Sequence, residues 1–260
     1  MNIQWYPGHM AKTRRMIEEN LKAVDLVVEI VDARAPLATR NPDFDRIFAK
    51  KPRIVLLNKS DLADARITEQ WAAWFGVQGV CALAVTCTGG KGVKPVVDLV
   101  GRVMAPEVAR MAQKGVRKTV RAMVVGIPNV GKSTFINKLR GRAAARASDK
   151  PGVTRGKQWI ILGPYLEFLD TPGMLWPKFE DKAVARRLAY LGSVRDDIMD
   201  LEELACAFLS DMAQVNPQAL TQRFKMTDFE GEPYALLERA CQGRGWLLSG
   251  GGLTRCAARG

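Results

Sequence analysis

The apolar residues of this 260-residue chain gather in short runs that alternate with segments of helical spacing. The runs typical of buried strands cover residues 26–31, 54–57, 82–85, 120–125, 159–162 and 166–169. Helical spacing predicts helices over residues 10–22, 44–49, 68–75 and 93–111, and one more that follows a glycine-rich turn and runs through residue 140. Strands that alternate with helices in this way predict an α/β fold with a mostly parallel sheet covered on both faces.

The pattern changes after residue 178. Strand-like runs stop, and leucine and phenylalanine recur at helical spacing, at positions 188, 191, 201, 204, 208 and 209. We therefore expect an α/β domain over residues 1–178 and a small all-α domain over residues 179–260. No internal repeat divides either part.

Composition argues against several classes of protein. Hydrophobic residues make up 47% and charged residues 25%, as is ordinary for a globular chain. No apolar run is long enough to span a bilayer, and the first nine residues lack the basic and then apolar order of a signal peptide. The five cysteines form no Cys-x-x-Cys pair and there is a single histidine, which argues against zinc. We expect a soluble protein of the reducing cytoplasm.

The charge balance points to a polyanionic partner. Lysine and arginine total 39 against 27 acidic residues, a formal net charge of +12. Much of the excess lies in two stretches, residues 102–121 and 140–157. Because clustered positive charge attracts nucleic acid through phosphate contacts and counterion release, this distribution favours a nucleic-acid partner over a basic surface that serves only solubility.

The strongest chemical signal is the segment from Gly126 to Ser133, GIPNVGKS, which lies between a predicted strand and a predicted helix. It matches the phosphate-loop pattern G-x-x-x-x-G-K-[ST], whose backbone N–H groups surround phosphate oxygens at a helix N-terminus. Lys132 is expected to reach the β- and γ-phosphates, and Ser133 Oγ to bind Mg²⁺. The residues expected to contact the nucleotide here are Asn129, Val130, Gly131, Lys132, Ser133 and Thr134.

A second motif selects the base. The strand ending at residue 57 is followed by Asn58-Lys59-Ser60-Asp61, which fits the guanine-specificity pattern N-K-x-D. The Asp61 carboxylate can accept hydrogen bonds from guanine N1–H and the exocyclic amine, whereas adenine offers neither donor there. Asn58 would tether the loops, and the Lys59 stem would pack over the base. Ordinary turns contain similar residues, so the assignment of this motif depends on a second motif that follows the next strand.

That neighbour is Thr86-Cys87, which ends the next strand, where GTPases usually carry Ser-Ala. The backbone N–H of Cys87 could bond guanine O6, and the thiol is interpreted as a small filler side chain rather than a nucleophile. Two motifs at the carboxyl ends of consecutive parallel strands point to one guanine site.

A third motif begins with Asp170 after the strand ending at residue 169. Asp170-Thr171-Pro172-Gly173 matches D-x-x-G, in which Asp170 would hold Mg²⁺ through water and the Gly173 N–H would bond the γ-phosphate. Thr154, in the preceding loop, is the candidate switch threonine on Mg²⁺. A plain turn at the end of a strand is the alternative.

The order of these motifs is permuted. In most small GTPases the phosphate loop comes first, followed by the switch threonine, D-x-x-G and N-K-x-D. Here the guanine motif precedes the phosphate loop while the cyclic order is kept. The same site can assemble if a segment joins the original ends, and we expect the basic stretch at residues 101–119 to be that linker. The switch after Gly173 then leads directly into the carboxy-terminal domain, which should sense loss of the γ-phosphate.

On these motifs, on the opening Trp5-Tyr6-Pro7-Gly8-His9-Met10 and on the stretch VDARAP at residues 31–36, the chain resembles the circularly permuted GTPases of the ribosome biogenesis GTPase A family. The resemblance covers nearly the whole chain. It implies hydrolysis of GTP to GDP, and a role in late assembly of the large (50S) ribosomal subunit with rRNA contacts partly from the tail. The chain ends where the family usually begins its last helices.

The resemblance also bears on catalysis. Where Ras-like enzymes place a water-orienting glutamine, this chain has Met174, whose thioether cannot orient water. Likeness to the family points to His9, with a helix-capping or surface histidine as the alternative. Asn129 resembles the residue that binds K⁺ in potassium-activated GTPases, with hydrogen bonding within the loop as the alternative. The catalytic set is therefore His9, Lys132 and Gly173.

The preferred hypothesis is a GTP hydrolase with slow intrinsic turnover, a monomer whose partners are a large-subunit precursor and rRNA, not DNA or membrane. One alternative is an RNA-binding placeholder timed by its GTP state, for which hydrolysis is incidental. Another is a permuted GTPase that serves the small subunit or an organelle.

Overall fold

The computed structural model describes residues 8–89, 93–146, 159–177, 179, 181–194 and 200–246. The chain divides into two compact units, Met1–Glu180 and Asp181–Gly260. Each unit is described by itself below. Among the described residues, no helix combines the length and the apolar composition that a membrane span requires.

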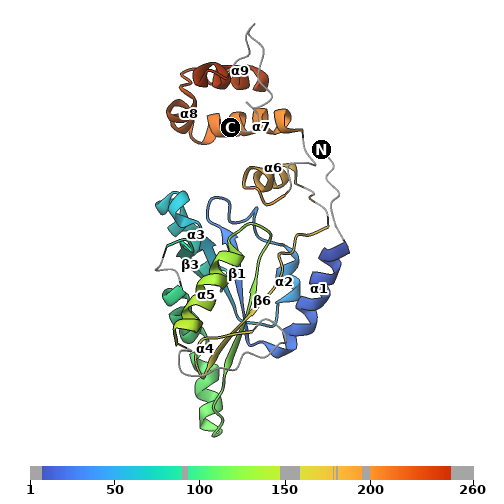
Figure 1. Cartoon of the computed structure of the whole chain (residues 1–260), viewed down its shortest axis with the longest axis vertical. Helices are drawn as coiled ribbons and strands as arrows, with labels where there is room; N and C mark the ends of the chain where they lie inside the picture. Colours follow the sequence, from blue (N-terminus) through green and yellow to red (C-terminus); the bar gives the residue numbers. More distant parts are fainter. Residues whose placement is uncertain are drawn as a thin grey trace. The chain divides into compact units, whose positions relative to one another are not determined.

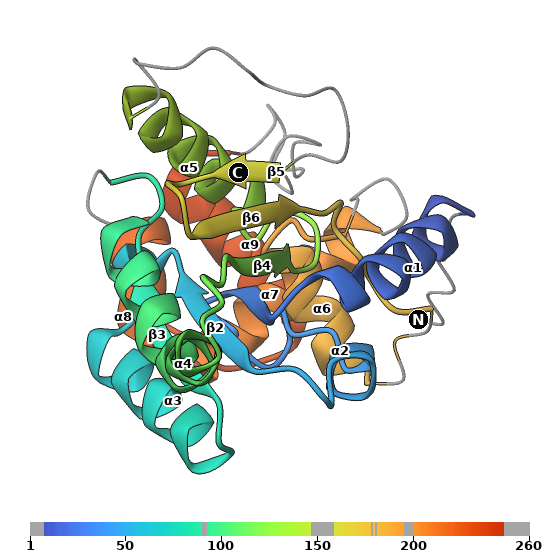
Figure 2. The ribbon, with the colours of Figure 1, turned by 90° about the horizontal axis from the view of Figure 1, so that it is seen from below.

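The first unit contains a six-stranded sheet in the order β3-β2-β1-β4-β6-β5 (Figures 1 and 2). The strands are β1 (Leu26–Asp32), β2 (Arg53–Asn58), β3 (Cys81–Val85), β4 (Val120–Val125), β5 (Trp159–Ile161) and β6 (Leu166–Asp170). Neighbouring strands run parallel, except that β5 pairs antiparallel with β6. The α/β fold and the mostly parallel sheet are confirmed.

The pairing of β1 with β4 brings the early and late parts of the permuted chain together in one sheet. Leu26 pairs with Ala122, and Glu29 pairs with Val125, although about ninety residues of chain separate the two strands. All seven residues of β1 are buried because the strand lies in the centre of the sheet, with a neighbour on each edge and helices over its faces. The guanine motif and the phosphate loop therefore end strands on opposite sides of the same central strand.

The helices of this unit flank the sheet and are α1 (Gly8–Asn20), α2 (Asp43–Ile47), α3 (Ala65–Val77), α4 (Val93–Gln113) and α5 (Lys132–Arg146). Ile17 of α1 and Phe44 of α2 pack in one core cluster with Leu169 of β6. The preceding residue of β6, Phe168, instead meets Phe135 of α5, with ring centroids 6.3 Å apart. Since successive strand residues point to opposite faces, α5 covers the face opposite to α1 and α2 (Figure 2).

The segment that joins the original ends is largely helical, as the spacing of residues 93–111 predicts. Residues 101–113 of the expected linker continue helix α4, and only residues 114–119 lie outside helix and strand. Val96, Val100 and Met104 are buried at helical spacing, while Arg102 and Arg110 lie on the exposed side. Arginines of the basic stretch therefore lie on the solvent-facing side of the helix that leads from β3 towards β4.

Among the described residues of the second unit, helices are the only regular secondary structure. Its helices are α6 (Lys182–Tyr190), α7 (Leu201–Val215), α8 (Pro217–Phe224) and α9 (Pro233–Arg244). Asp181, Asp200 and Asn216 cap the first three, each accepting from backbone N–H groups in the first turn. The last three helices share a core cluster of Leu209, Leu220, Met226, Leu236, Leu237, Ala240 and Cys241.

Candidate functional site

The phosphate-loop segment lies where its mechanism requires, between the end of β4 and the start of α5. Two of its positions have no room for a side chain. A Cβ on Gly126 would lie 2.6 Å from the carbonyl oxygen of Ile30, and a Cβ on Gly131, which has φ +95°, would collide with the side-chain amide of Asn58. The glycines therefore allow this loop to approach both β1 and the guanine motif closely.

Lys132 occupies the first position of α5 and is only 8% exposed. Burial lowers the pKa of its ammonium group, and the charge of Asp170 acts in the opposite direction. A desolvated cation at a helix N-terminus is stabilised by an anion that replaces the lost water, which suits a phosphate.

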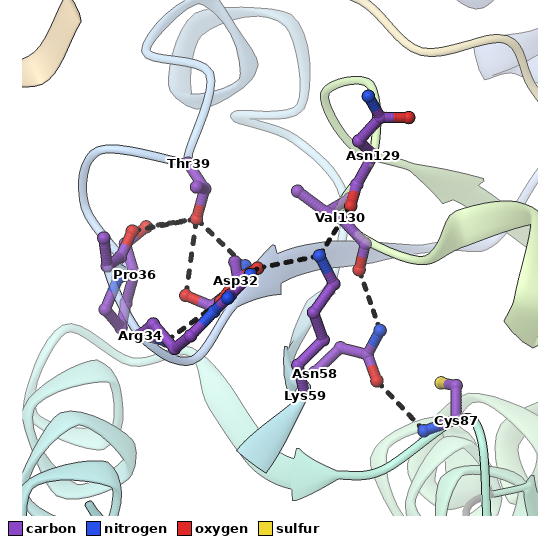
Figure 3. Close-up of polar contacts among 10 residues, drawn as sticks. Asp32, Arg34, Pro36, Thr39, Asn58, Lys59, Cys87, Asn129 and Val130 are labelled. Carbon is purple, nitrogen blue, oxygen red and sulfur yellow. Dashed lines mark hydrogen bonds and ion pairs between the residues drawn. The ribbon is translucent and has the colours of Figure 1, made fainter. Parts of the chain in front are cut away.

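The guanine motif and the phosphate loop are joined by direct hydrogen bonds (Figure 3). Asn58, at the end of β2 and 2% exposed, donates from Nδ2 to the carbonyl oxygen of Val130 at 2.8 Å. Lys59 Nζ donates to the carbonyl oxygen of Asn129 at 2.8 Å. Segments about seventy residues apart in sequence thus meet at one place, with the guanine motif first in the chain.

Asn58 also binds the end of β3. Its Oδ1 accepts from the backbone N–H of Cys87 at 3.0 Å, and Ser60 Oγ donates to the carbonyl oxygen of Val85 at 3.1 Å and lies 3.2 Å from Thr86 Oγ1. The Cys87 N–H therefore already has an acceptor, so a bond to guanine O6 requires a shared hydrogen or a small shift of Asn58.

The Cys87 side chain is 4% exposed, and burial raises the pKa of its thiol to about 11, partly offset by Lys138. At neutral pH the group is a thiol, not a thiolate, and it is a poor nucleophile. This agrees with its interpretation as a small filler residue. Asp61, in contrast, lies exposed in the short 3₁₀ helix η2 (Ser60–Leu62), where its carboxylate is accessible to a ligand.

The D-x-x-G segment lies against the phosphate loop. Thr171 Oγ1 donates to the carbonyl oxygen of Val124 at 2.6 Å, and the Met174 N–H donates to that of Gly126 at 3.1 Å. A Cβ on Gly173 would lie 2.9 Å from the Pro128 nitrogen, so only glycine allows this approach. The segment thus brings the Gly173 backbone beside the loop that is expected to hold the phosphates.

The residues proposed for Mg²⁺ are chemically suited to it. Ser133 supplies a hydroxyl on α5, and Asp170 supplies a carboxylate at the end of β6, opposite Val124 in the pairing with β4. Burial raises the pKa of Asp170, while Lys132 and Arg140 oppose the shift. In the described part of the chain, no group of three or more His, Cys, Asp or Glu side chains is placed so that it could hold a metal ion by itself. A hydroxyl and one carboxylate fit Mg²⁺, which takes most remaining ligands from phosphates and water.

Two predicted residues lie wholly or partly outside the described part of the chain, and two others are described. Thr154 lies outside the described residues, and His9 lies in α1 by its backbone while its side chain is not described. Asn129 has φ 62°, and its carbonyl oxygen accepts from Lys59, while its side-chain amide points away from that contact (Figure 3). Met174 is 1% exposed and packs in the core, so this side chain cannot face a catalytic water.

Sequence reasoning gave no role to the polar residues at the end of β1 and in the loop after it, and cited Asp32 and Arg34 only within the stretch VDARAP. Asp32 Oδ2 lies 3.0 Å from Lys59 Nζ, and Arg34 Nη2 lies 2.7 Å from the same oxygen. Farther along, Asn41 Nδ2 donates to the carbonyl oxygen of Met174 at 2.9 Å. The available signal was an acidic residue at the end of a buried strand, followed two residues later by arginine.

Comparisons with known proteins agree with this geometry. A family model described as 50S ribosome-binding GTPase matches residues 121–232. Ribosome biogenesis GTPase A of Priestia megaterium is 47% identical over 253 residues, 96% of this chain and 88% of that protein. Mitochondrial ribosome-associated GTPase 1 of Mus musculus is 36% identical over 214 residues, 78% of this chain and 64% of that protein. The crystal structure of GNP-bound YlqF from T. maritima aligns with a TM-score of 0.62 at 27% identity, covering 95% of this chain and 89% of that one.

Proposed function

We propose that this chain, which belongs to the ribosome biogenesis GTPase A family and is a GTPase of circularly permuted order, times a step of large-subunit assembly by GTP hydrolysis. The main support for the nucleotide site is the 2.8 Å hydrogen bond from Asn58 Nδ2 to the carbonyl oxygen of Val130, which joins the guanine motif to the phosphate loop.

In this proposal the guanine base lies against Asn58, Lys59 and Asp61. The Asp61 carboxylate accepts from N1–H and the exocyclic amine, and the Lys59 stem covers one face of the base. Ser60 and Thr86 hold the ends of β2 and β3 together. Cys87 offers its N–H to guanine O6 while sharing it with Asn58.

The phosphates lie along the loop and the start of α5. Backbone N–H groups from Asn129 to Thr134 surround the phosphate oxygens, and Lys132 reaches the β- and γ-phosphates. Gly173 donates its N–H to the γ-phosphate, so the loop that follows senses its loss. Ser133, Thr154 and Asp170 would hold Mg²⁺, which neutralises charge on the phosphates when bound. Asn129 is the proposed ligand for K⁺, which would supply further positive charge.

For hydrolysis we propose His9 as the group that orients water, because the buried Met174 cannot do so. Turnover without a partner should be slow, since the motifs supply neither a glutamine nor an arginine finger. His9→Ala should slow phosphate release and leave GTP affinity nearly unchanged, and an unaltered rate would return His9 to a surface or capping role. Equal rates in K⁺ and Na⁺ would remove the proposed monovalent site at Asn129.

The nucleotide assignment is tested by the exchange of one carboxylate for an amide. Asp61→Asn should weaken GDP binding and move selectivity towards xanthosine diphosphate, because the amide presents a donor where guanine also donates. Asp64→Asn is the matched control: Asp64 is three residues away, and asparagine retains its role as N-cap of α3. Titration of both variants with fluorescent guanosine and xanthosine diphosphates gives the result. An unchanged preference for guanine in Asp61→Asn would refute the base assignment.

The ribosomal role rests on family membership and on the basic surface. We propose that the chain acts in the cytoplasm as a monomer, binding a large-subunit precursor and its rRNA through clustered lysine and arginine residues. Phosphate release should rise when large-subunit precursors are added, and not when mature small subunits are added.

Two alternative functions predict different results in phosphate-release and binding experiments. Tight RNA binding without stimulated hydrolysis would favour an RNA-binding placeholder. Co-sedimentation with small subunits in a GTP analogue, or stimulation only by organellar particles, would favour a GTPase of another particle.

A further inference from the structure

Asp32 is buried at the carboxyl end of β1, and in the sheet it pairs with Asn58 of the guanine motif. Its side chain is 1% exposed. Arg34 forms a two-pronged contact with it, Nε to Oδ1 at 2.9 Å and Nη2 to Oδ2 at 2.7 Å (Figure 3). Burial alone would raise the pKa of Asp32, but the hydrogen bonds from Arg34 and Lys59 outweigh it, and the pKa is lowered. The carboxylate is therefore charged at neutral pH.

This carboxylate faces the ammonium group of Lys59. Lys59 Nζ lies 3.0 Å from Asp32 Oδ2 and donates to the Asn129 carbonyl oxygen at 2.8 Å. One cation is thus held between an anion on β1 and the backbone of the phosphate loop (Figure 3). Lys59 itself has a left-handed backbone conformation, φ 60° and ψ 34°.

The loop after β1 keeps the carboxylate in place. Thr39 Oγ1 accepts from the backbone N–H of Asp32 at 2.9 Å and donates to the carbonyl oxygen of Ala35 at 2.9 Å, and Thr39 is 1% exposed. Charges therefore alternate along Arg34, Asp32 and Lys59.

We propose that Asp32, supported by Arg34, is a positioning residue for guanine-nucleotide binding, which holds Lys59 against the phosphate loop before the nucleotide arrives. The inference rests on the proposed nucleotide site. A lysine side chain that is fixed in advance loses less rotamer freedom when it packs over a base, so the free energy of binding is more favourable. The contact contributes to affinity and leaves the chemical step unchanged.

The test replaces the carboxylate by its neutral isostere. Asp32→Asn should raise the dissociation constant for fluorescent GDP about tenfold, the usual effect of removing a hydrogen bond to a charged group. KM for GTP should rise, and kcat should remain that of the wild type. The matched control is Asp25→Asn at the opposite end of β1, which removes a similar pair with Lys118, 2.7 Å away, outside the nucleotide site. It should leave nucleotide affinity unchanged.

A double-mutant cycle separates positioning from general stability. In a Lys59→Met background, Asp32→Asn should cause no further loss of GDP affinity, because the group that it positions is absent. Equal losses in both backgrounds would overturn the inference. If Asp32→Asn does not fold, Arg34→Met serves as the test variant, because the Arg34 side chain is 32% exposed and its replacement disturbs the core less. Arg34→Met should weaken GDP binding several-fold in the wild-type background and should have no effect in the Lys59→Met background.

The two hypotheses fail in different ways. If the wild-type chain binds no GDP, the proposed function is wrong. If the wild type binds GDP and the Asp32→Asn and Arg34→Met variants bind it equally well, the nucleotide site stands and the positioning role of Asp32 is wrong.

Discussion

The side chain of Asn58 is the physical link between three loops, and its removal is the most direct test of how the site is assembled. In Asn58→Ala, the carbonyl oxygen of Val130 and the N–H of Cys87 lose their hydrogen bonds at 2.8 and 3.0 Å. Both bonds lie in the interior, since Asn58 is 2% exposed and Cys87 4% exposed. A hydrogen bond contributes about 1 kcal/mol net, and a buried group left without a partner costs about 1–3 kcal/mol. We expect the free energy of unfolding to fall by about 3 kcal/mol.

The measurement should read the first unit separately, because a chain of two units need not unfold in a single transition. Urea unfolding followed by hydrogen-exchange mass spectrometry of peptides from β2 and β4 meets this need. Asn137→Ala, on the exposed side of α5, is the matched control and should change the value by less than about 0.5 kcal/mol. If Asn58→Ala loses no more than this control, the hydrogen bonds do not hold the loops together and the reasoning fails.

Gly131→Ala tests the same contact from the other side. Its new Cβ would collide with the Asn58 side chain, and its φ of +95° adds strain that remains whatever the neighbour. The substitution should therefore cost less in an Asn58→Ala background than in the wild type. Strictly additive losses would show that the two residues do not meet.

Three further predictions concern neighbouring positions. Gly173→Ala should weaken GTP binding more than GDP binding, because its Cβ would lie 2.9 Å from the Pro128 nitrogen and move the N–H expected at the γ-phosphate; equal losses would contradict this placement. Burial raises the pKa of Glu29 from 4.5 to about 7, opposed by two arginines, so its contribution to stability is present below pH 4.5 and is lost as the pH rises through about 7. Urea unfolding of Glu29→Gln should show a smaller fall over that interval, and parallel curves would refute the shift. Cys87, with its raised thiol pKa, should be alkylated by iodoacetamide far more slowly than the exposed Cys81, as peptide mass spectrometry can measure; similar rates would show that its burial is wrong.

The strands were the most predictable part of the fold. Runs of valine, leucine and isoleucine such as residues 26–31 and 120–125 are long enough and apolar enough to identify buried strands without knowledge of their partners. The order of the strands in the sheet could not be predicted from these runs, because apolar residues do not specify which strand will be the neighbour. The chemistry of the motifs implied only that the strands leading into them end near one nucleotide, and the pairing of β1 with β4 was seen only in the structure.

The polar network after β1 could not be predicted in the same way. Asp32 in the sequence is one acidic residue at a strand end, and its meaning depends on Lys59 and Asn129 reaching the same point from other strands. The same holds for Asn41, whose partner is the carbonyl oxygen of Met174, 133 residues away. Contacts of this range arise from the packing of the sheet, and no local pattern encodes them.

The chemistry of this protein follows from its sequence, because the phosphate loop, the guanine motif and D-x-x-G are short segments whose residue types and flanking elements have a physical meaning of their own. How these segments form one site depends on the packing of the sheet. Asn58 meets Val130, and Gly173 approaches Pro128, only because β2, β1, β4 and β6 lie side by side in parallel, which brings their carboxyl ends to one edge of the sheet.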